Sequence, residues 1–296
     1  VSAQISNLTD YPQLFYMGVR VRIYMAKGYY ADAIKELDMM ERIEGTAALF
    51  VLANRAECYE NLYQYRKAIA DLTALLNINA DYAYAYLNRG CCYTGIGDYT
   101  NALNDFSYVI QNHPSYAANG YYLRTIVQWE QKRYDDALSD ISRCIELNPA
   151  ESAYLWRGRL ELIQGDTAKA KVDFEQVLAM DTTIDGSSVR QYALHFLGRD
   201  TEALAWMDSI LVAEPTQGNY YDAACLYALM GRTEQALSAF DKALSLGYRD
   251  FQHIAADTDL DAIRDLPRFK EILNKYRKQE VQSKFDLLKG ADTDMK

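Results

Sequence analysis

The sequence predicts an all-α fold, a solenoid built from a repeated pair of helices. An alanine recurs at steps of 35, 34, 35, 33, 33 and 33 residues, and each copy lies in a similar run of aromatic, glycine and aliphatic residues. A unit of about 34 residues repeated at least three times is typical of helical solenoids, in which each repeat buries its apolar face only against its neighbours. We therefore expect one continuous, curved array of helix pairs. The anchor alanines are Ala33, Ala68, Ala102, Ala137, Ala170, Ala203 and Ala236.

Each repeat predicts the same two elements in the same order. A first helix rich in tyrosine runs to a glycine, a short turn follows, and the anchor alanine lies early in a second helix that ends near Pro or Gly. The two helices are expected to cross closely where small residues meet, as at Gly90 and Ala102. Glycine tolerates the left-handed conformation that ends many helices. The glycines in that place are Gly28, Gly97, Gly165, Gly198 and Gly231.

The third, fifth and seventh repeats carry a recognisable motif. Residues 83–114 read AYAYLNRGCCYTGIGDYTNALNDFSYVIQNHP, and the motif residues there are Gly90, Tyr93, Gly97, Tyr99, Ala102, Phe106 and Pro114. The fifth repeat has Tyr154, Gly158, Gly165, Ala170 and Phe174, and the seventh has Tyr220, Ala224, Tyr227, Gly231, Ala236 and Phe240. This pattern resembles the tetratricopeptide repeat (TPR) family over about residues 14–246. The resemblance implies a right-handed superhelical solenoid.

The sixth repeat departs from the motif. It has Gln191 where a small residue is usual and Met207 in place of Phe. The segment Asp185–Ser188 precedes it, and we expect this segment to shorten the first helix of that repeat.

The predicted organisation has four parts. Residues 1–13 form an N-terminal segment, residues 14–248 hold seven TPR-like repeats, residues 249–289 form C-terminal capping helices, and residues 290–296 form a tail or linker. Pro267 is well placed to start a helix. Apolar residues then recur at helical spacing, which predicts a helix that covers the exposed face of the last repeat. These residues are Phe269, Ile272, Leu273 and Tyr276.

Composition excludes several classes of function. The net charge of -10 argues against nucleic acid as a partner, because a phosphate-tracking protein shows a basic stripe. The chain has no run of 18 apolar residues, so no membrane insertion is expected. Its five cysteines form no CxxC pair and no Cys/His metal spacing, so we expect neither a metal site nor a cofactor. Val1–Ala3 resembles the end of a signal peptide, which would indicate export to the periplasm or cell envelope; a cloning boundary would leave the protein cytoplasmic.

Two columns of opposite charge accompany the anchor alanines. An arginine lies thirteen residues before the alanine and an acid lies three residues after it, and the seventh repeat lacks both. Because the two members occur together, we interpret them as a structural ladder of ion pairs that bridges the helices of each repeat. The alternative is a basic track for an acidic ligand. The ladder consists of Arg20 with Glu36, Arg55 with Asp71, Arg89 with Asp105, Arg124 with Asp140, and Arg157 with Asp173.

The sequence predicts no catalytic residue. It contains no P-loop, HExxH, GxSxG or dinucleotide-binding motif. None of its three histidines has a paired nucleophile or acid dictated by spacing. These histidines are His113, His195 and His253.

The resemblance implies a protein or peptide partner that docks in a concave groove lined by the first helices. That groove lacks the Lys and Asn residues with which chaperone-binding TPR domains hold a C-terminal carboxylate. The alternative for its rings is packing against the next repeat. A longer enzyme, for example with a protease-like domain beyond residue 296, and homo-oligomerisation also stay open. The predicted groove residues are Phe50, Tyr84, Leu87, Tyr122, Ile126, Trp129, Leu155, Arg159, Tyr192, His195 and Tyr221.

Overall fold

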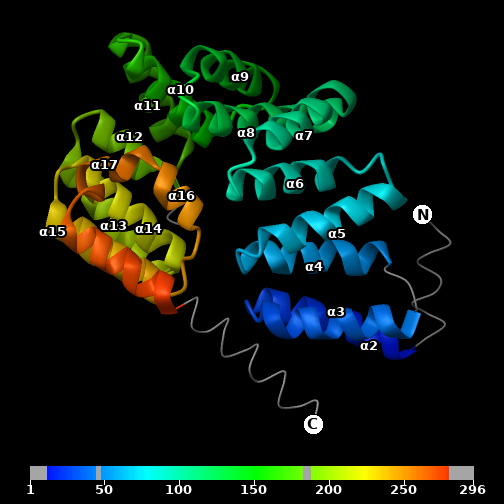
Figure 1. Cartoon of the computed structure of the whole chain (residues 1–296). Coiled ribbons are helices and arrows are strands. Elements are labelled where there is room, and N and C mark those ends of the chain that lie inside the picture. Colours follow the sequence, from blue (N-terminus) through cyan, green and yellow to red (C-terminus); the bar gives the residue numbers. More distant parts are fainter. Residues whose placement is uncertain (1–11, 45–47, 183–187, 280–296) are drawn as a thin grey trace. The chain divides into compact units, whose positions relative to one another are not determined.

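The computed structural model describes residues 12–44, 48–182 and 188–279. The described residues form helices joined by turns and loops and contain no strand, which confirms the predicted all-α class (Figure 1). The chain divides into two compact units, residues 1–148 (unit 1) and residues 149–296 (unit 2). Val1–Ala3 and the predicted tail at residues 290–296 lie outside the described residues, as do residues 185–187.

Unit 1 contains four successive helix pairs. Each helix packs against its partner, and the second helix of each pair packs against the first helix of the next. A short 3-10 helix, η1 (Pro114–Tyr116), leads into the fourth pair. The pairs are α2 (Pro12–Ala26) with α3 (Tyr30–Glu44), α4 (Leu49–Asn61) with α5 (Tyr65–Ile78), α6 (Ala83–Gly95) with α7 (Tyr99–Asn112), and α8 (Ala117–Glu130) with α9 (Tyr134–Leu147).

Unit 2 contains three helix pairs and a C-terminal segment. The pairs are α10 (Glu151–Ile163) with α11 (Thr167–Met180), α12 (Arg190–Phe196) with α13 (Asp200–Ala213), and α14 (Gln217–Leu229) with α15 (Thr233–Ser245). The segment comprises α16 (Phe251–Ala256), η2 (Thr258–Leu260), α17 (Asp261–Arg264) and a helix over residues 267–279. The predicted shortening of the first helix in the sixth repeat is confirmed, since α12 has 7 residues and α10 and α14 have 13 each.

The anchor alanines lie at the centre of every helix pair, and all seven are 0% exposed. Four residues further on, each of the last five repeats places a large side chain in the core, and Met207 replaces phenylalanine there without loss of burial. A Cβ at Gly158 would lie 2.6 Å from the Phe174 ring, so only glycine fits there. At Gly90 the atoms nearest to such a Cβ belong to Phe106, so the close approach expected from Ala102 comes from that ring instead.

The residue that ends the first helix has a positive φ in all seven repeats. Five of these residues are the predicted glycines, with φ between 69° and 83°. The other two are Tyr63 (φ 55°) and Lys132 (φ 59°), both in unit 1. A side chain in this region costs about 1–2 kcal/mol relative to ordinary helical backbone, so these two helix ends are strained.

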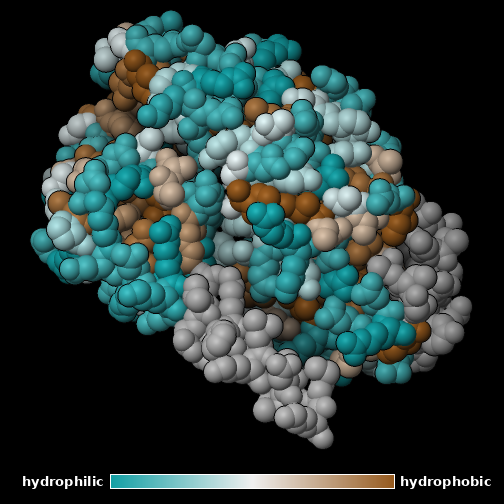
Figure 2. Space-filling view, viewed as in Figure 1, coloured by the Kyte–Doolittle hydropathy of each residue, from teal (hydrophilic) through white to brown (hydrophobic). Residues whose placement is uncertain are grey.

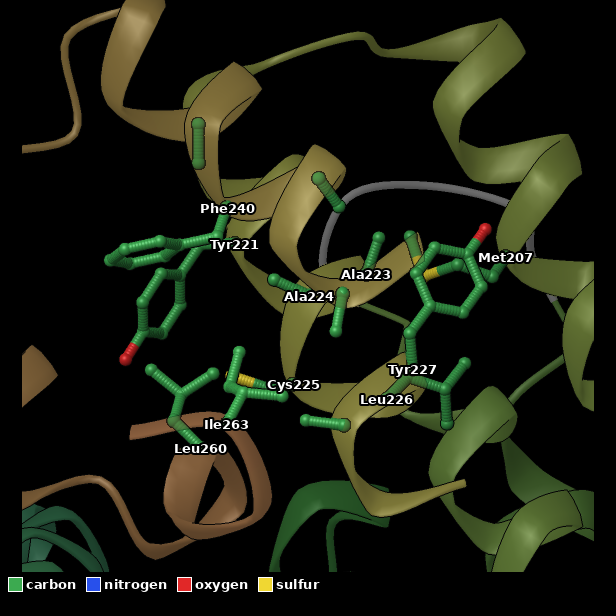
Figure 3. Packing of buried hydrophobic residues seen from close by; sticks show 14 of the residues in the cluster. Met207, Tyr221, Ala223, Ala224, Cys225, Leu226, Tyr227, Phe240, Leu260 and Ile263 are labelled. Atoms are coloured by element: carbon green, nitrogen blue, oxygen red, sulfur yellow. The ribbon is translucent and has the colours of Figure 1, made fainter. Parts of the chain in front are cut away.

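The core of unit 2 surrounds α14, which is buried along most of its length. Figure 3 shows Leu260 and Ile263 on the side of α14 that carries Tyr221 and Cys225, and Met207 on the side that carries Tyr227. The helix over residues 267–279 contributes Phe269, whose ring stacks on that of Phe240 with centroids 4.5 Å apart. The C-terminal segment therefore belongs to the same core as the helix pairs of unit 2.

Candidate protein-interaction surface

The structure brings each ladder arginine to its acid across the two helices of one repeat. Arg89 donates from Nε to Oδ2 and from Nη2 to Oδ1 of Asp105, both at 2.8 Å. These hydrogen bonds raise the pKa of Arg89 above its ordinary value. The remaining pairs are Arg20–Glu36 at 2.8 Å, Arg55–Asp71 at 2.8 Å, Arg124–Asp140 at 2.6 Å and Arg157–Asp173 at 2.7 Å.

Burial of the ladder differs along the chain. The Arg20 side chain is 51% exposed, whereas those of Arg89 and Asp105 are 16% and 9% exposed. Exposed ion pairs are worth about 0–1 kcal/mol, while removal of one partner from a buried pair costs about 3–5 kcal/mol. The inner pairs are thus placed to tie the helices together, and the arginines present no free basic track because their carboxylates face them.

The sixth repeat holds its arginine by other means. Arg190 donates to the carbonyl oxygens of Leu178 (2.6 Å) and Asp181 (2.7 Å), and its guanidinium lies 5.0 Å from the centre of the Trp206 ring. Trp206 stands in the place of the missing acid. Sequence reasoning missed this substitution of a cation–π contact for an ion pair.

The predicted groove residues of unit 1 divide into accessible and buried side chains. Tyr84 is 55% exposed, and Phe50, Tyr122 and Ile126 are half-buried. Leu87 and Trp129 are 5% and 8% exposed, so they belong to the core in this structure. The Trp129 ring meets that of Tyr134 on α9 edge to face, with centroids 5.5 Å apart. Trp129 therefore packs within the fourth repeat in this structure, whereas the sequence placed it among the groove residues.

The accessible residues come from the first helices α4, α6 and α8, and we call their surface the first-helix face of unit 1. The first helix α4 also carries an acid, Glu60, near its C-terminal end. The Glu60 carboxylate accepts a hydrogen bond from the Cys92 thiol, with Sγ and Oε1 3.4 Å apart, and burial raises the pKa of Glu60 to about 7. The accessible side chains that define the face, Phe50, Tyr84, Tyr122 and Ile126, are aromatic and aliphatic.

The corresponding face of unit 2 is covered by the chain itself. Leu155, Tyr192 and Tyr221 are buried, and the side chain of Arg159 is mostly buried. The Tyr221 hydroxyl donates to Oδ2 of Asp257 at 2.8 Å, and its ring stacks on that of Tyr248 with centroids 4.3 Å apart. Residues of the C-terminal segment therefore occupy the place that was predicted for a partner.

An ion pair joins this covering segment to α10. Arg159 donates from Nη2 to Oδ1 of Asp259, and the two side chains are only 12% and 10% exposed. Burial raises the pKa of Asp259, while Arg159 opposes that shift. The backbone N–H of Asp259 donates to Oδ1 of Asp257 at 2.9 Å, which orders the short η2 helix. The first helices of unit 2 thus hold a partly extended, acidic segment.

The last predicted groove residue, His195, pairs locally instead of lining an open surface. Its Nδ1 lies 2.8 Å from Oδ1 of Asp200, the first residue of α13. Among residues 12–44, 48–182 and 188–279, no three His, Cys, Asp or Glu side chains gather as a metal ion would require.

The surface in view in Figure 2 is mostly hydrophilic, with hydrophobic residues in separate patches. None of the helices described has the length and apolar character needed to cross a membrane.

Comparison with known proteins decides the family. Sequence profiles of the tetratricopeptide repeat match residues 84–116, 122–183 and 218–246. The chain is a tetratricopeptide-repeat protein. A solved tetratricopeptide repeat protein from Parabacteroides merdae is similar over 90% of this chain and 100% of its own, with a TM-score of 0.58 and 19% identity. The solenoid of helix pairs is therefore confirmed.

Two further relatives share part of this TPR chain. MamA from Desulfovibrio magneticus RS-1 is similar over 57% of this chain and 94% of its own, with a TM-score of 0.51 and 18% identity. A curated chloroplastic protein from Arabidopsis thaliana is 34% identical over 83 residues, which are 27% of this chain and 25% of that protein. The match thus spans about a quarter of the plant protein, and the likeness to MamA concerns the fold alone.

Proposed function

We propose that this TPR protein is a noncatalytic protein-interaction scaffold that binds a peptide or protein segment on the first-helix face of unit 1. The observation that carries the proposal is the contrast between the two units. In unit 2 the equivalent first helices hold a segment of the chain itself, through the Tyr221–Asp257 and Arg159–Asp259 contacts. In unit 1 the first helices α4, α6 and α8 leave Tyr84 exposed. They leave Phe50, Tyr122 and Ile126 accessible in part.

Three features of that face support a peptide partner. Its side chains are large and rigid, and aromatic residues dominate the energetics of protein interfaces. The residues come from consecutive first helices, so a segment that runs along the array can contact several of them. The ladder acids beneath this face are paired with arginines, so they do not present free charge to a partner.

Site-specific photo-crosslinking tests the proposal. A photoreactive phenylalanine analogue at position 84 is compared with the same analogue at position 29, because Tyr84 and Tyr29 are 55% and 56% exposed and only Tyr84 lies on the face. We expect a covalent adduct with a native-extract protein from position 84 and none from position 29. Binding of that purified partner should weaken in Tyr84→Ala and persist in Tyr29→Ala.

Two outcomes would refute the proposal. The first is the same adducts from both positions, which would show collision without a specific surface. The second is adducts from neither position while the native extract contains partners that bind elsewhere on the chain.

A further inference from the structure

A pocket of about 400 Å3 lies in unit 1 between the second helices α7 and α9, over the first helix α8. It is separate from the accessible side chains of the first-helix face of unit 1. Its lining is polar apart from one leucine. The lining residues are Leu103, Ser107, Arg124, Gln128, Arg133, Asp136, Ser139 and Asp140.

The pocket lies in a repeat that lacks a tyrosine found in four of the other repeats. Nine residues before the anchor alanine, the first, second, third and seventh repeats have Tyr24, Tyr59, Tyr93 and Tyr227. The fourth repeat has Gln128 in this position, the fifth has Glu161 and the sixth has Leu194. A carboxamide side chain is much smaller than a phenol ring, and close-packed interiors do not refill such a volume without a partner.

The ladder arginines show what is missing from the pocket. In the third repeat the guanidinium of Arg89 lies 5.4 Å from the centre of the Tyr86 ring and 5.9 Å from that of Tyr93. In the fourth repeat the guanidinium of Arg124 lies 5.5 Å from the centre of the Tyr121 ring, and Gln128 takes the position of the second ring. The pocket wall is thus half of an arginine–tyrosine arrangement that the preceding repeat completes.

The polar groups of the pocket agree with this reasoning. The Gln128 side chain lines the pocket, the residue is 5% exposed, and its Oε1 has no hydrogen-bond partner within the described part of the chain. The pocket wall contains two arginines and two aspartates, and they form ion pairs with one another. Arg124 pairs with Asp140, and Arg133 pairs with Asp136. An anion would therefore meet two carboxylates, whereas a neutral ring with a hydroxyl donor meets no opposing charge.

We propose that this pocket binds a phenol ring, presented as the tyrosine side chain of a protein partner. The ring takes the position that Tyr93 holds in the third repeat, against the guanidinium of Arg124. Its hydroxyl supplies a donor for the Gln128 carboxamide. The guanidinium–ring contact and the hydroxyl bond favour tyrosine over aliphatic side chains.

The probe is N-acetyl-L-tyrosinamide, and N-acetyl-L-leucinamide is the comparison. Saturation-transfer NMR measures the binding of each amide to the whole chain. We expect saturable binding of the tyrosine amide and no saturable binding of the leucine amide. Gln128→Tyr supplies the ring from the chain itself, and should weaken binding by about tenfold or more while raising the melting temperature. Gln128→Asn keeps the carboxamide and the open volume, so it should retain binding.

The proposal fails if the tyrosine amide shows no saturable binding, or if it binds equally to the wild type and to Gln128→Tyr. It also fails if the leucine amide binds as well as the tyrosine amide, because the pocket would then be merely an apolar volume. Because tyrosine occupies the same position in four other repeats, Gln128→Tyr is compatible with the fold. A lower melting temperature for this variant would contradict the assignment of the pocket as a vacant tyrosine position.

Discussion

The two units use the same helix pairs and differ in what lies on their first helices. In unit 1, the first helices α4, α6 and α8 leave Tyr84 exposed and Tyr122 and Ile126 accessible in part. In unit 2, the residues around η2 lie on α10 and α14, where Arg159 and Tyr221 hold two aspartates. A first-helix face is therefore not a binding surface by virtue of the repeat alone, because the chain that follows decides whether it is open.

The largest effect is expected from Arg159→Ala in unit 2. The change leaves the buried Asp259 carboxylate without its cation, which should lower the free energy of unfolding by about 3–5 kcal/mol. Arg143→Ala is the control, because Arg143 and its partner Glu146 are 55% and 59% exposed. Differential scanning calorimetry measures both variants. If Arg159→Ala unfolds at the same temperature as Arg143→Ala, the C-terminal segment does not depend on this ion pair.

A somewhat smaller effect is expected from Arg89→Ala in unit 1. Its loss strands Asp105, which is 9% exposed, and should cost about 3 kcal/mol, whereas loss of the exposed Arg20 should cost about 0–1 kcal/mol. Lys132→Ala removes an exposed charge that belongs to no ladder pair, and it should change the melting temperature least. Thermal unfolding of the three variants gives the ranking. Equal and small changes in all three would refute the ladder as a stabilising element.

The ends of the first helices provide a third comparison, with an effect of about 1 kcal/mol. Unit 2 has glycine at all three of these positions, and unit 1 has Tyr63 and Lys132 at two of its four. Lys132→Gly should raise the stability by about 1 kcal/mol, because glycine adopts a φ of 59° without strain. Lys171→Gly, in the interior of α11, should lower it by a similar amount. Chemical denaturation measures both, and the same sign for the two changes would contradict the account.

The smallest expected effect is a change in pH dependence. Glu161 stands in unit 2 where Gln128 stands in unit 1, and it is 7% exposed with no partner for Oε2 within the described residues. Burial, assisted by Asp173 and opposed by Arg157, raises the pKa of Glu161. The folded state therefore holds this proton more tightly than the unfolded state does, and stability falls as the pH rises above about 4.3.

Glu161→Gln removes that titration. The variant should be more stable than the wild type at pH 8 and should lose this advantage at pH 4, when the wild-type carboxyl group is protonated. Glu175→Gln is the control, because the Glu175 side chain is 59% exposed. Melting temperatures between pH 4 and pH 8 test the sign. An advantage that grows toward pH 4 would show that the carboxylate is stabilised in the folded protein.

The period of the sequence was sufficient to predict the fold, because each repeat carries its own copy of the packing residues. The anchor alanines and the glycine helix ends occupy the same structural positions in successive repeats. The positions of the ladder residues follow from the same period, since Arg89 and Asp105 face each other within one helix pair.

Features that cross repeats could not be predicted from the sequence. Asp259 reaches Arg159 across 100 residues, and no local pattern connects the two. Trp129 was expected on the groove and lies in the core, because an aromatic residue at helical spacing serves packing and recognition equally well. The Oε1 atom of Gln128, which has no hydrogen-bond partner among the described residues, pointed to a binding site only when the structure showed the pocket that this side chain lines.

The contact between Arg159 and Asp259 also constrains the order of events during synthesis. Unit 1 is built from contacts between neighbouring helices, so each helix pair can find its neighbour as soon as it leaves the ribosome. In unit 2 the guanidinium of Arg159 meets Asp259 only after 100 further residues have been translated. Unit 2 is therefore complete only after its C-terminal segment has been synthesised. A nascent chain that stalls before residue 259 leaves the first helices of unit 2 uncovered and open to other binding partners.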